Sequence, residues 1–441
     1  MTHQLTLVDA VARHAGSTPS RLAIVDGDAR ITYSQLWQMV EDEAQRLRQE
    51  GVSKGQLVLV RGNQHVSFLV TCLAVHRLGA VVAPVGSDLP QQQFDALHQC
   101  CHDAALDEDI ADVLFTTGTM GQQKGVMVSH TALLSDAENL IDAQGFTADT
   151  VFVITGPLSH IGSLSKTWPV LLLGGTLILL DGMRDLDAFF KAMAWPTGLL
   201  ATFLVPTAID MVLRFGQSRL AALANRIDFI ETGAAAISEP TLQALCTTLP
   251  SSRLFNTYAS TETGIVCTHD FNHGLRDPRC LGRPMKHAHV RITDDGRIAC
   301  RGDMVMTGYL GQPALTRERF SDGWLVTDDL GEKDADGRLH FKGRQGEIIN
   351  VGGYKVSPIE VEQAARGVPG IADCVLVAAQ LPLGTVLKLI YTSDSGQPLD
   401  HRVVARQLAA QLERYKVPMC YEHVASLHYT FNGKVDRKAY R

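Results

Sequence analysis

Short apolar runs of strand length alternate with helical stretches through the first 265 residues. The runs at 56–61, 80–84, 177–180, 198–203 and 229–232 are strand-like, and stretches such as 66–78 between them are helical. Such alternation is typical of a parallel sheet covered by helices. We therefore predict that this part of the chain is α/β.

The pattern changes twice further along the chain. Residues 5–50 predict a helix, a short hairpin and a second helix, which is capped within 31–34 and starts near Gln35. Between 288 and 345 the runs become short β pieces separated by turns with Asp-Gly. After 346 the β/α pattern returns, with strands at 347–351, 374–379 and 387–391 and helices at 358–366 and 400–412. We predict a large multi-sheet N-terminal domain (1–342), a boundary at 343–346 and a small α+β C-terminal domain (347–441).

Composition narrows the class of protein. The 441 residues are 45% hydrophobic and 20% charged, and a net charge of −7 argues against a nucleic-acid partner. No apolar run approaches the ~18 residues of a membrane span, since Gly174 and Gly175 interrupt the longest, around 170–180. Charged residues in 1–20 argue against a signal peptide. The nine cysteines contain no C-x-x-C pair. They predict free thiols in a reducing cytoplasm and no zinc site.

Residues 116–125, with the sequence TTGTMGQQKG, are the strongest candidate for chemistry. They lie between the apolar runs 113–115 and 126–128 and are therefore predicted to form a turn between two strands. Glycines let backbone N–H groups approach an anion, threonines add donors, and a lysine offsets its charge. The spacing is not that of a Walker loop. A hairpin loop without a ligand is the alternative.

Two acidic turns are weaker candidates. Residues 256–264, NTYASTETG, place one carboxylate, Glu262, among hydroxyls, which suits Mg²⁺ shared with phosphate oxygens. A helix N-cap at Ser260 is the alternative. Residues 324–331 contain the pair Asp328 and Asp329, and an acidic pair in a turn is usually only solvated.

Taken together with 343–362 and 431–438, these segments resemble, in the same order, the motifs of the adenylate-forming superfamily. That superfamily contains acyl-CoA synthetases, nonribosomal peptide synthetase adenylation domains and firefly luciferase. The resemblance runs from about residue 5 to 440. The chain departs from the motifs at Met120, Gln123, Ala259, Asp328 and Gly346.

The resemblance implies a role for each matching residue. Lys434 would bridge the carboxylate and the α-phosphate, Thr261 would touch the α-phosphate, and Glu262 would hold Mg²⁺. Asp329 would accept hydrogen bonds from both ribose hydroxyls, and Gly346 would be the hinge. The implied nucleotide-binding residues are Thr116, Thr117, Gly118, Thr119, Gly121, Lys124, Gly233, Ala234, Tyr258, Asp329 and Arg344.

The acyl pocket is implied by the segment PLSHIG at 157–162. His160 would gate the pocket mouth, although a histidine in an apolar stretch is often a packed core residue. Ile161 stands where amino-acid-activating relatives carry aspartate and aryl-acid relatives asparagine, so an acid without an α-amine is expected. Matching other segments adds Ser165, Phe203, Ile230, Thr232, Thr257, Ile265 and Val266.

The implied enzyme is an AMP-forming acid–thiol ligase that uses ATP and Mg²⁺. A small aliphatic or aryl acid would form acyl-AMP and pass to a phosphopantetheine thiol of CoA or of a separate carrier protein. The implied setting is cytoplasmic, and a homodimer is an option. Two alternatives remain: a stand-alone amino-acid adenylation domain, and a relative that binds nucleotide but turns over weakly.

Overall fold

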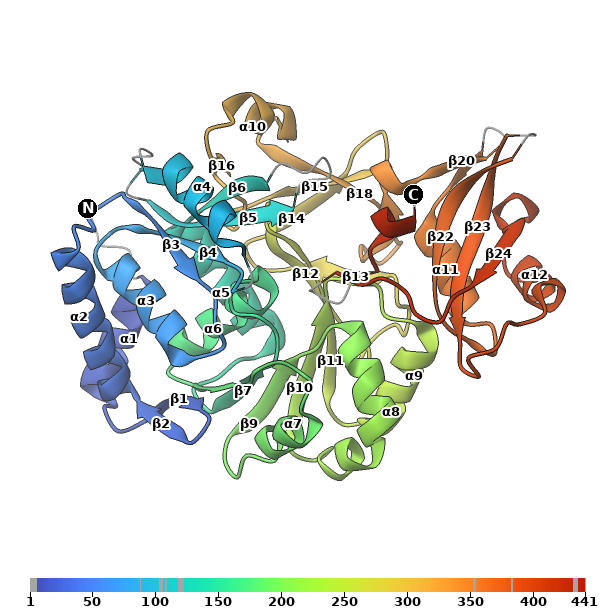
Figure 1. Cartoon of the computed structure of the whole chain (residues 1–441). Helices are drawn as coiled ribbons and strands as arrows, with labels where there is room; N and C mark the ends of the chain where they lie inside the picture. The colour runs from blue at the N-terminus through green and yellow to red at the C-terminus, as the bar shows by residue number, and fades with distance from the viewer. Residues whose placement is uncertain are drawn as a thin grey trace.

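A large mixed sheet organises the N-terminal part of the chain (Figure 1). The computed structural model describes residues 6–87, 89–102, 106–107, 109–117, 123–351, 354–381, 384–430 and 435–440. The sheet has 14 strands. In spatial order they are β14 (His289–Ile292), β15 (Arg297–Arg301), β18 (Trp324–Lys333), β19 (Leu339–Arg344), β13 (Cys280–Pro284), β12 (Gly264–Asp270), β11 (Arg253–Ser260), β10 (Ile227–Gly233), β9 (Leu199–Phe203), β7 (Thr150–Ile154), β8 (Thr176–Leu179), β1 (Leu22–Asp26) and β2 (Ala29–Thr32), with β17 (Phe320–Ser321) beside β18.

The middle of this sheet is parallel and is covered by helices on both faces. The strands from β1 through β8, β7, β9 and β10 to β11 pair in parallel, as the β/α alternation predicts. One hydrophobic cluster involves α1 (Leu7–Ser17), α2 (Tyr33–Gln49), α3 (Val66–Arg77), α5 (His130–Gln144) and α6 (Ile161–Leu173). A second involves α7 (Leu186–Met193), α8 (Pro206–Ala222) and α9 (Glu239–Thr248) on the other face. Side chains of alternate residues on these strands therefore enter different cores.

A smaller sheet carries the predicted phosphate loop. Its order is β16 (Gly308–Tyr309), β6 (Gln123–Ser129), β5 (Ile110–Thr117), β4 (Val81–Val85) and β3 (Leu57–Arg61). β5 and β6 are antiparallel, so the predicted turn between two strands is confirmed. α10 (Pro313–Arg319) follows β16, and α4 (Gln91–His102) occupies part of the polar stretch between β4 and β5.

The C-terminal part forms its own layer of sheet and helices, at the right of Figure 1. Its strands are β20 (Ile349–Val351) with β21 (Tyr354–Val356), and β22 (Ile371–Leu381), β23 (Gly384–Ser393) and β24 (Cys420–His423). α11 (Pro358–Arg366) and α12 (His401–Ala409) bury a separate hydrophobic cluster against them. The predicted hinge at 343–346 covers the end of β19 and the start of the 3₁₀ turn Gln345–Glu347 that precedes β20.

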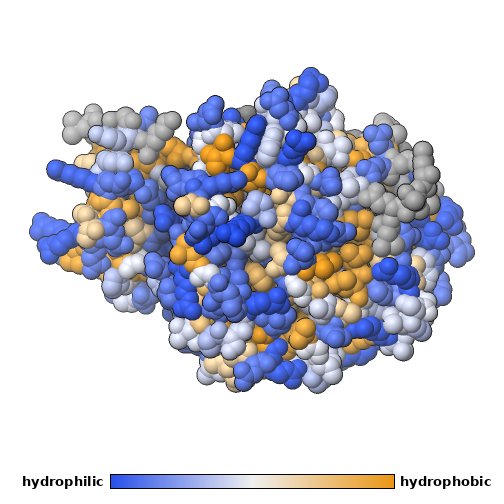
Figure 2. All heavy atoms as spheres, turned by 180° about the vertical axis from the view of Figure 1, so that it is seen from behind, coloured by the Kyte–Doolittle hydropathy of each residue, from blue (hydrophilic) through white to orange (hydrophobic). Residues whose placement is uncertain are grey.

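Two local expectations differ from the structure. The second helix begins at Tyr33 instead of near Gln35, because Thr32 is its N-cap and forms a capping box with Gln35. Glu347 belongs to the 3₁₀ turn and not to a strand. Within the described residues, no helix combines the length and the hydropathy needed to cross a membrane. Seen from behind, hydrophobic residues lie in separate patches among hydrophilic ones (Figure 2).

Candidate active site

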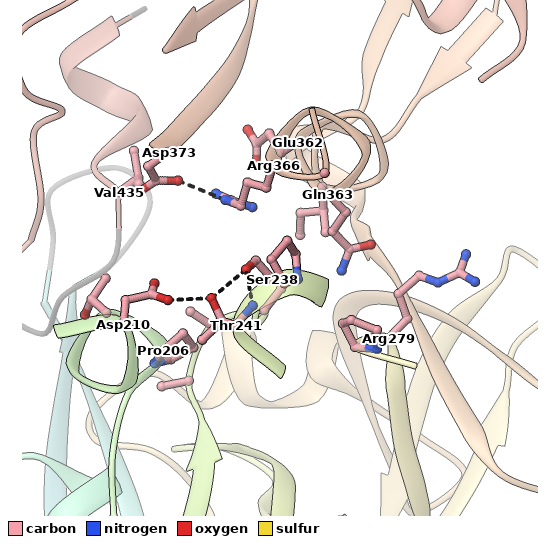
Figure 3. Close-up of a pocket in the computed structure, with 18 of the residues that line it drawn as sticks. Pro206, Asp210, Ser238, Thr241, Arg279, Glu362, Gln363, Arg366, Asp373 and Val435 are labelled. Atoms are coloured by element: carbon pink, nitrogen blue, oxygen red, sulfur yellow. Dashed lines mark hydrogen bonds and ion pairs between the residues drawn. The ribbon is translucent and has the colours of Figure 1, made fainter. Parts of the chain in front are cut away.

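A cavity of about 1120 Å³ lies where the C-terminal part meets the large sheet. Figure 3 shows α8 and α9 contributing Asp210, Ser238 and Thr241 to one side, and α11 contributing Gln363 and Arg366 to the other. Six residues predicted from sequence line it together: Gly233, Ala234, Thr257, Tyr258, Asp329 and Arg344. They come from four strands and one following loop, so the sheet brings together residues more than a hundred positions apart.

The backbone turns sharply at the end of β10. A Cβ at Gly233 would lie 2.7 Å from the Thr257 carbonyl oxygen, so only glycine fits beside β11. Ala234, the next residue, has φ +66°, a left-handed conformation that costs a residue with a side chain roughly 1–2 kcal/mol. Ligands of open α/β sheets bind outside the carboxyl ends of parallel strands, which is where this bare backbone lies.

Asp329 is held from two sides. The Tyr258 hydroxyl donates to Oδ2 at 2.8 Å, and Arg344 Nε donates to Oδ1 at 2.7 Å. Asp329 and Arg344 are register partners on β18 and β19, which fixes the second contact. Burial, and then the charge of Asp329, raises the pKa of Tyr258 well above its usual 10, so the phenol remains a donor at neutral pH. A carboxylate oxygen accepts more than one hydrogen bond, so Asp329 can still accept from a diol in the cavity.

Glu262 lies in the turn between β11 and β12. Ser260 and Thr263 exchange backbone-to-side-chain hydrogen bonds of 3.0 Å across this turn, and Thr261 is half-buried within it. Strands flank the turn on both sides, so the alternative of a helix N-cap at Ser260 is wrong. The Tyr309 hydroxyl donates to Glu262 Oε1 at 3.2 Å.

Tyr309 connects Glu262 to the predicted phosphate loop. Lys124 Nζ lies 5.4 Å from the centroid of its ring, and Tyr309 pairs with Val126 across β16 and β6. Sequence reasoning missed Tyr309, because its place depends on a strand pairing between residues far apart in the chain. Among the described residues, no group of three His, Cys, Asp or Glu side chains could hold a metal ion. One carboxylate at Glu262 fits Mg²⁺, which binds through few protein ligands together with phosphate oxygens and water.

Part of the predicted site lies outside the described residues. Thr116 pairs with Lys124, and Thr117 with Gln123, in the register of β5 and β6. The predicted residues that are not described are Gly118, Thr119, Gly121 and Lys434. Val435, directly after Lys434, lines the large cavity (Figure 3). Gly346 has nothing within 4 Å of the position where a Cβ would stand.

The predicted acyl residues gather around the start of α6 and the ring of Phe203. His160 is the N-cap of α6, with Nδ1 accepting from the Gly162 N–H at 3.1 Å. A Cβ at Gly162 would lie 3.6 Å from the Phe203 ring, and one at Gly233 would lie 3.7 Å from it. Ile161, Phe203 and Ile265 belong to the same hydrophobic core. Ser165 is buried on α6, and Thr257 Oγ1 accepts from Gln144 Nε2 at 3.0 Å.

Three predicted acyl residues do not join that group. Ile230 packs into the core under α7–α9, and Thr232 shares its face of β10 because strand side chains alternate. Val266 packs with Tyr258 in a further cluster. The residue of β10 that faces α6 is Glu231, whose Oε1 lies 2.7 Å from Lys166 Nζ. The motif match named Ile230 and Thr232, whereas Glu231 between them faces the opposite side of the sheet.

Comparisons with known proteins establish the family of this chain. A family model described as AMP-binding enzyme matches residues 11–107 and 98–310. The indoleacetate–CoA ligase of Aromatoleum aromaticum is 28% identical over 498 residues, which covers 98% of this chain and 96% of the ligase. A feruloyl-CoA synthase of Amycolatopsis sp is 27% identical, with 96% of each chain covered.

Solved structures share the whole fold. ATP-bound MatB from Rhodopseudomonas palustris has a TM-score of 0.89 at 24% identity, covering 99% of this chain and 98% of that one. MenE, the o-succinylbenzoate CoA synthetase from Bacillus subtilis, has a TM-score of 0.84 at 21% identity, covering 98% and 97%. The predicted α/β class, with a large multi-sheet part and a small C-terminal sheet, is thereby confirmed. The chain belongs to the AMP-binding enzymes, the adenylate-forming superfamily that contains the AMP-forming acid–thiol ligases.

Proposed function

We propose that this enzyme activates a small carboxylic acid that lacks an α-amine and passes it to a phosphopantetheine thiol. The carboxylate oxygen bonds to the α-phosphorus of ATP while the bond to the β-phosphate oxygen breaks, giving acyl-AMP and pyrophosphate. The thiolate then bonds to the acyl carbon, and AMP leaves with the electrons of the broken C–O bond. Both steps concentrate anions, so positioning and charge stabilisation are the tasks of the protein.

The observation that carries this proposal is Asp329, fixed by Tyr258 and Arg344 on the wall of the large cavity. A buried carboxylate with both oxygens oriented suits recognition of a ribose diol. The bare backbone at Gly233 and Ala234 lies on the same cavity and suits close approach of the rest of a nucleotide. The names of the relatives, one of them a structure bound to ATP, support the same reading.

The remaining roles are proposals from the family motifs. Lys434 bridges the attacking carboxylate and the α-phosphate, Thr261 contacts that phosphate, and Lys124 neutralises the outer phosphates. Mg²⁺, held by Glu262 and by phosphate oxygens, supplies further charge stabilisation when bound. Gly346 is the pivot about which the C-terminal part turns between the two half-reactions. The cytoplasmic setting and the homodimer also stay predictions.

The acceptor is CoA or a separate carrier protein. The names of the relatives favour CoA, since indoleacetate–CoA ligase and feruloyl-CoA synthase are CoA ligases. The NGK sequence at 432–434 resembles peptide-synthetase domains more closely and favours a carrier. Thioester formation from the same acyl-AMP, offered CoA or a phosphopantetheinylated carrier, decides between the two.

The test is a panel of acids with ATP and Mg²⁺, scored by pyrophosphate release with and without hydroxylamine to trap acyl-AMP. We expect release with aliphatic or aryl acids and none with amino acids. Release with amino acids alone would establish a stand-alone amino-acid adenylation domain instead. ATP binding without release across the panel would establish a nucleotide-binding relative.

Two matched variants test whether ATP binds in the cavity. Asp329→Ala removes the carboxylate held inside and should raise the KM for ATP at least about tenfold, the loss expected for a charged hydrogen bond. Asp328→Ala removes the neighbouring carboxylate, which pairs with Arg319 at 2.6 Å and is half-exposed. It should leave the KM within about twofold. Equal effects of the two variants would contradict the assigned role of Asp329.

A further inference from the structure

A lysine and a glutamate are buried together behind the predicted acyl residues. Lys166 Nζ of α6 lies 2.7 Å from Glu231 Oε1 of β10, and their side chains are only 3% and 0% exposed. Taking two charges out of water is unfavourable, and hydrophobic residues of similar size often replace such a pair without loss of stability. A pair kept at this position is therefore a candidate for a role in binding.

The ring of Phe203 connects the pair to the predicted acyl residues. Lys166 Nζ lies 5.5 Å from the centroid of that ring. The same ring lies against Gly162 at the start of α6 and against Gly233. Gly233 itself lines the large cavity. Phe203 therefore lies near both Gly233, on the wall of the nucleotide cavity, and the buried pair of Lys166 and Glu231.

Two buried acceptor atoms on this side of the sheet lack a partner within the described part of the chain. One is Glu231 Oε2, and the other is Gln144 Oε1. Gln144 reaches the same wall through its hydrogen bond to Thr257, which is the register partner of Gly233 on β11. Both unpaired atoms are acceptors, so a group that completes them must donate hydrogen bonds.

The charge around the pair is close to balanced. Asp136 of α5 is buried beside it, with Oδ1 accepting from the Ile265 N–H at 2.6 Å. Burial raises the pKa of Asp136 to about 7, and the Ile265 hydrogen bond and the charge of Lys166 limit the rise. One ammonium, one carboxylate and a partly protonated carboxyl leave no strong excess of either sign. A ligand with a full charge at its far end would be buried without a counterion.

We propose, resting on the proposed function, that the acid carries a neutral hydroxyl at the end remote from its carboxylate. The hydroxyl donates to Glu231 Oε2 and accepts from an N–H of Lys166, and Phe203 packs against the carbon skeleton between. Lys166 and Glu231 are then specificity-determining residues that discriminate a hydroxylated acid from its plain parent. Such discrimination is strong, because the parent acid leaves buried polar groups unpaired.

The test compares each acid with its hydroxylated partner: benzoate with its meta- and para-hydroxy derivatives, and hexanoate with ω-hydroxyhexanoate. Adipate and ω-aminohexanoate supply charged ends. We expect at least one hydroxylated acid to exceed its parent about a hundredfold in kcat/KM for pyrophosphate release. Calorimetric binding of the same pairs, in the presence of ATP and without turnover being needed, should show the same order. The charged acids should bind no better than the parents.

Two double variants test which residues cause the preference for hydroxylated acids. Lys166→Met with Glu231→Leu removes both charges at similar volume, which favours folding, and should reduce the hydroxyl preference to about threefold or less. The control is Lys286→Met with Glu138→Gln, which removes an ion pair of 2.7 Å exposed on the surface and should keep the full preference. Thermal unfolding shows whether the buried double variant folds. If it does not fold, the preference of the wild type for hydroxylated over plain acids decides whether the proposal stands.

The outcomes separate the inference from the function on which it rests. If parent and hydroxylated acids bind equally and yield equal amounts of trapped acyl-AMP, the hydroxyl proposal is overturned. The activation proposal would still stand. An ordered water would then supply the hydrogen bond that Glu231 Oε2 lacks. Preferential binding of a hydroxylated acid without any pyrophosphate release supports the pocket and contradicts the activity. A preference for adipate or ω-aminohexanoate overturns the neutral hydroxyl.

Discussion

Two walls of the active site differ in how complete they are without a ligand. The nucleotide wall consists of Tyr258, Asp329 and Arg344, and both carboxylate oxygens of Asp329 already have donors. The proposed acyl wall consists of Lys166, Phe203 and Glu231, and one carboxylate oxygen of Glu231 has no partner among the described residues. A wall that is complete beforehand suits a cosubstrate common to the whole family. A wall with an unpaired acceptor suits a substrate particular to this chain.

The difference has an energetic meaning. The hydrogen bonds of Asp329 fix its orientation before nucleotide binds, so little ordering remains to be done. An unpaired buried acceptor costs about 1–3 kcal/mol, and a ligand that supplies the missing donor recovers that free energy. The nucleotide wall therefore favours affinity through rigidity, whereas the acyl wall favours selectivity through an incomplete set of hydrogen bonds.

The largest expected effect is at Lys434, to which the family motif assigns contacts with both the carboxylate and the α-phosphate. Lys434→Ala should lower acid-dependent pyrophosphate release about a thousandfold, because a bridging cation between two reacting anions is lost. Transfer from preformed acyl-AMP to a thiol should change far less. Lys438→Ala, which removes another positive charge from the same tail, is the control. Equal loss in both half-reactions would contradict the role proposed for Lys434 in adenylation.

The next effect concerns the charge of the acyl wall. The pKa of Asp136 is raised to about 7, so its native state binds a proton more tightly than the unfolded chain does. That stabilisation is present below pH 4 and is lost as the pH rises to 7. Asp136→Asn cannot ionise, so its stability relative to the wild type should increase by about 2 kcal/mol at pH 5 and by roughly 4 kcal/mol at pH 8. Urea unfolding at both values measures it, and a gain independent of pH would contradict the assignment.

The same contrast between the walls explains what the sequence could predict. The family motifs pointed to Tyr258, Asp329 and Arg344, and all three lie on strands of the large sheet rather than in turns. The hairpin around the phosphate loop also followed from its two apolar runs. Local patterns thus located the nucleotide wall, and the structure brought its residues together in one cavity.

The residues of the acyl wall could not be predicted from such local patterns. Lys166 stands inside an apolar stretch of α6, where its partner cannot be read from spacing along the chain. The motif match named Ile230 and Thr232, and Glu231 lies on the opposite face of the same strand, where it contacts Lys166. Tyr309 reached Glu262 only through a pairing of β16 with β6. Each of these contacts depends on tertiary packing.

A smaller effect is expected when the hydrogen bond from Tyr258 to Asp329 is removed. Tyr258→Phe removes one hydrogen bond to a charged acceptor, worth about 1.5–3 kcal/mol, and should raise the KM for ATP about tenfold or more. The ratio between hydroxylated and plain acids should not change. Tyr421→Phe is the matched control, since that hydroxyl is buried without a partner in the described chain. A changed acid ratio in Tyr258→Phe would show that the two walls are not independent.

The smallest effect tests which face of β10 belongs to the acyl wall. Ile230 is buried in the core under α7–α9, so Ile230→Val should cost about 1 kcal/mol of stability and leave acid preference unchanged. Ile161 starts α6 and packs into the same core as Phe203, so Ile161→Val should change the relative kcat/KM of acids that differ by one methylene about tenfold. Both variants remove one methyl group, and only their faces differ. A shift in preference from Ile230→Val alone would return that residue to the pocket and move Glu231 out of it.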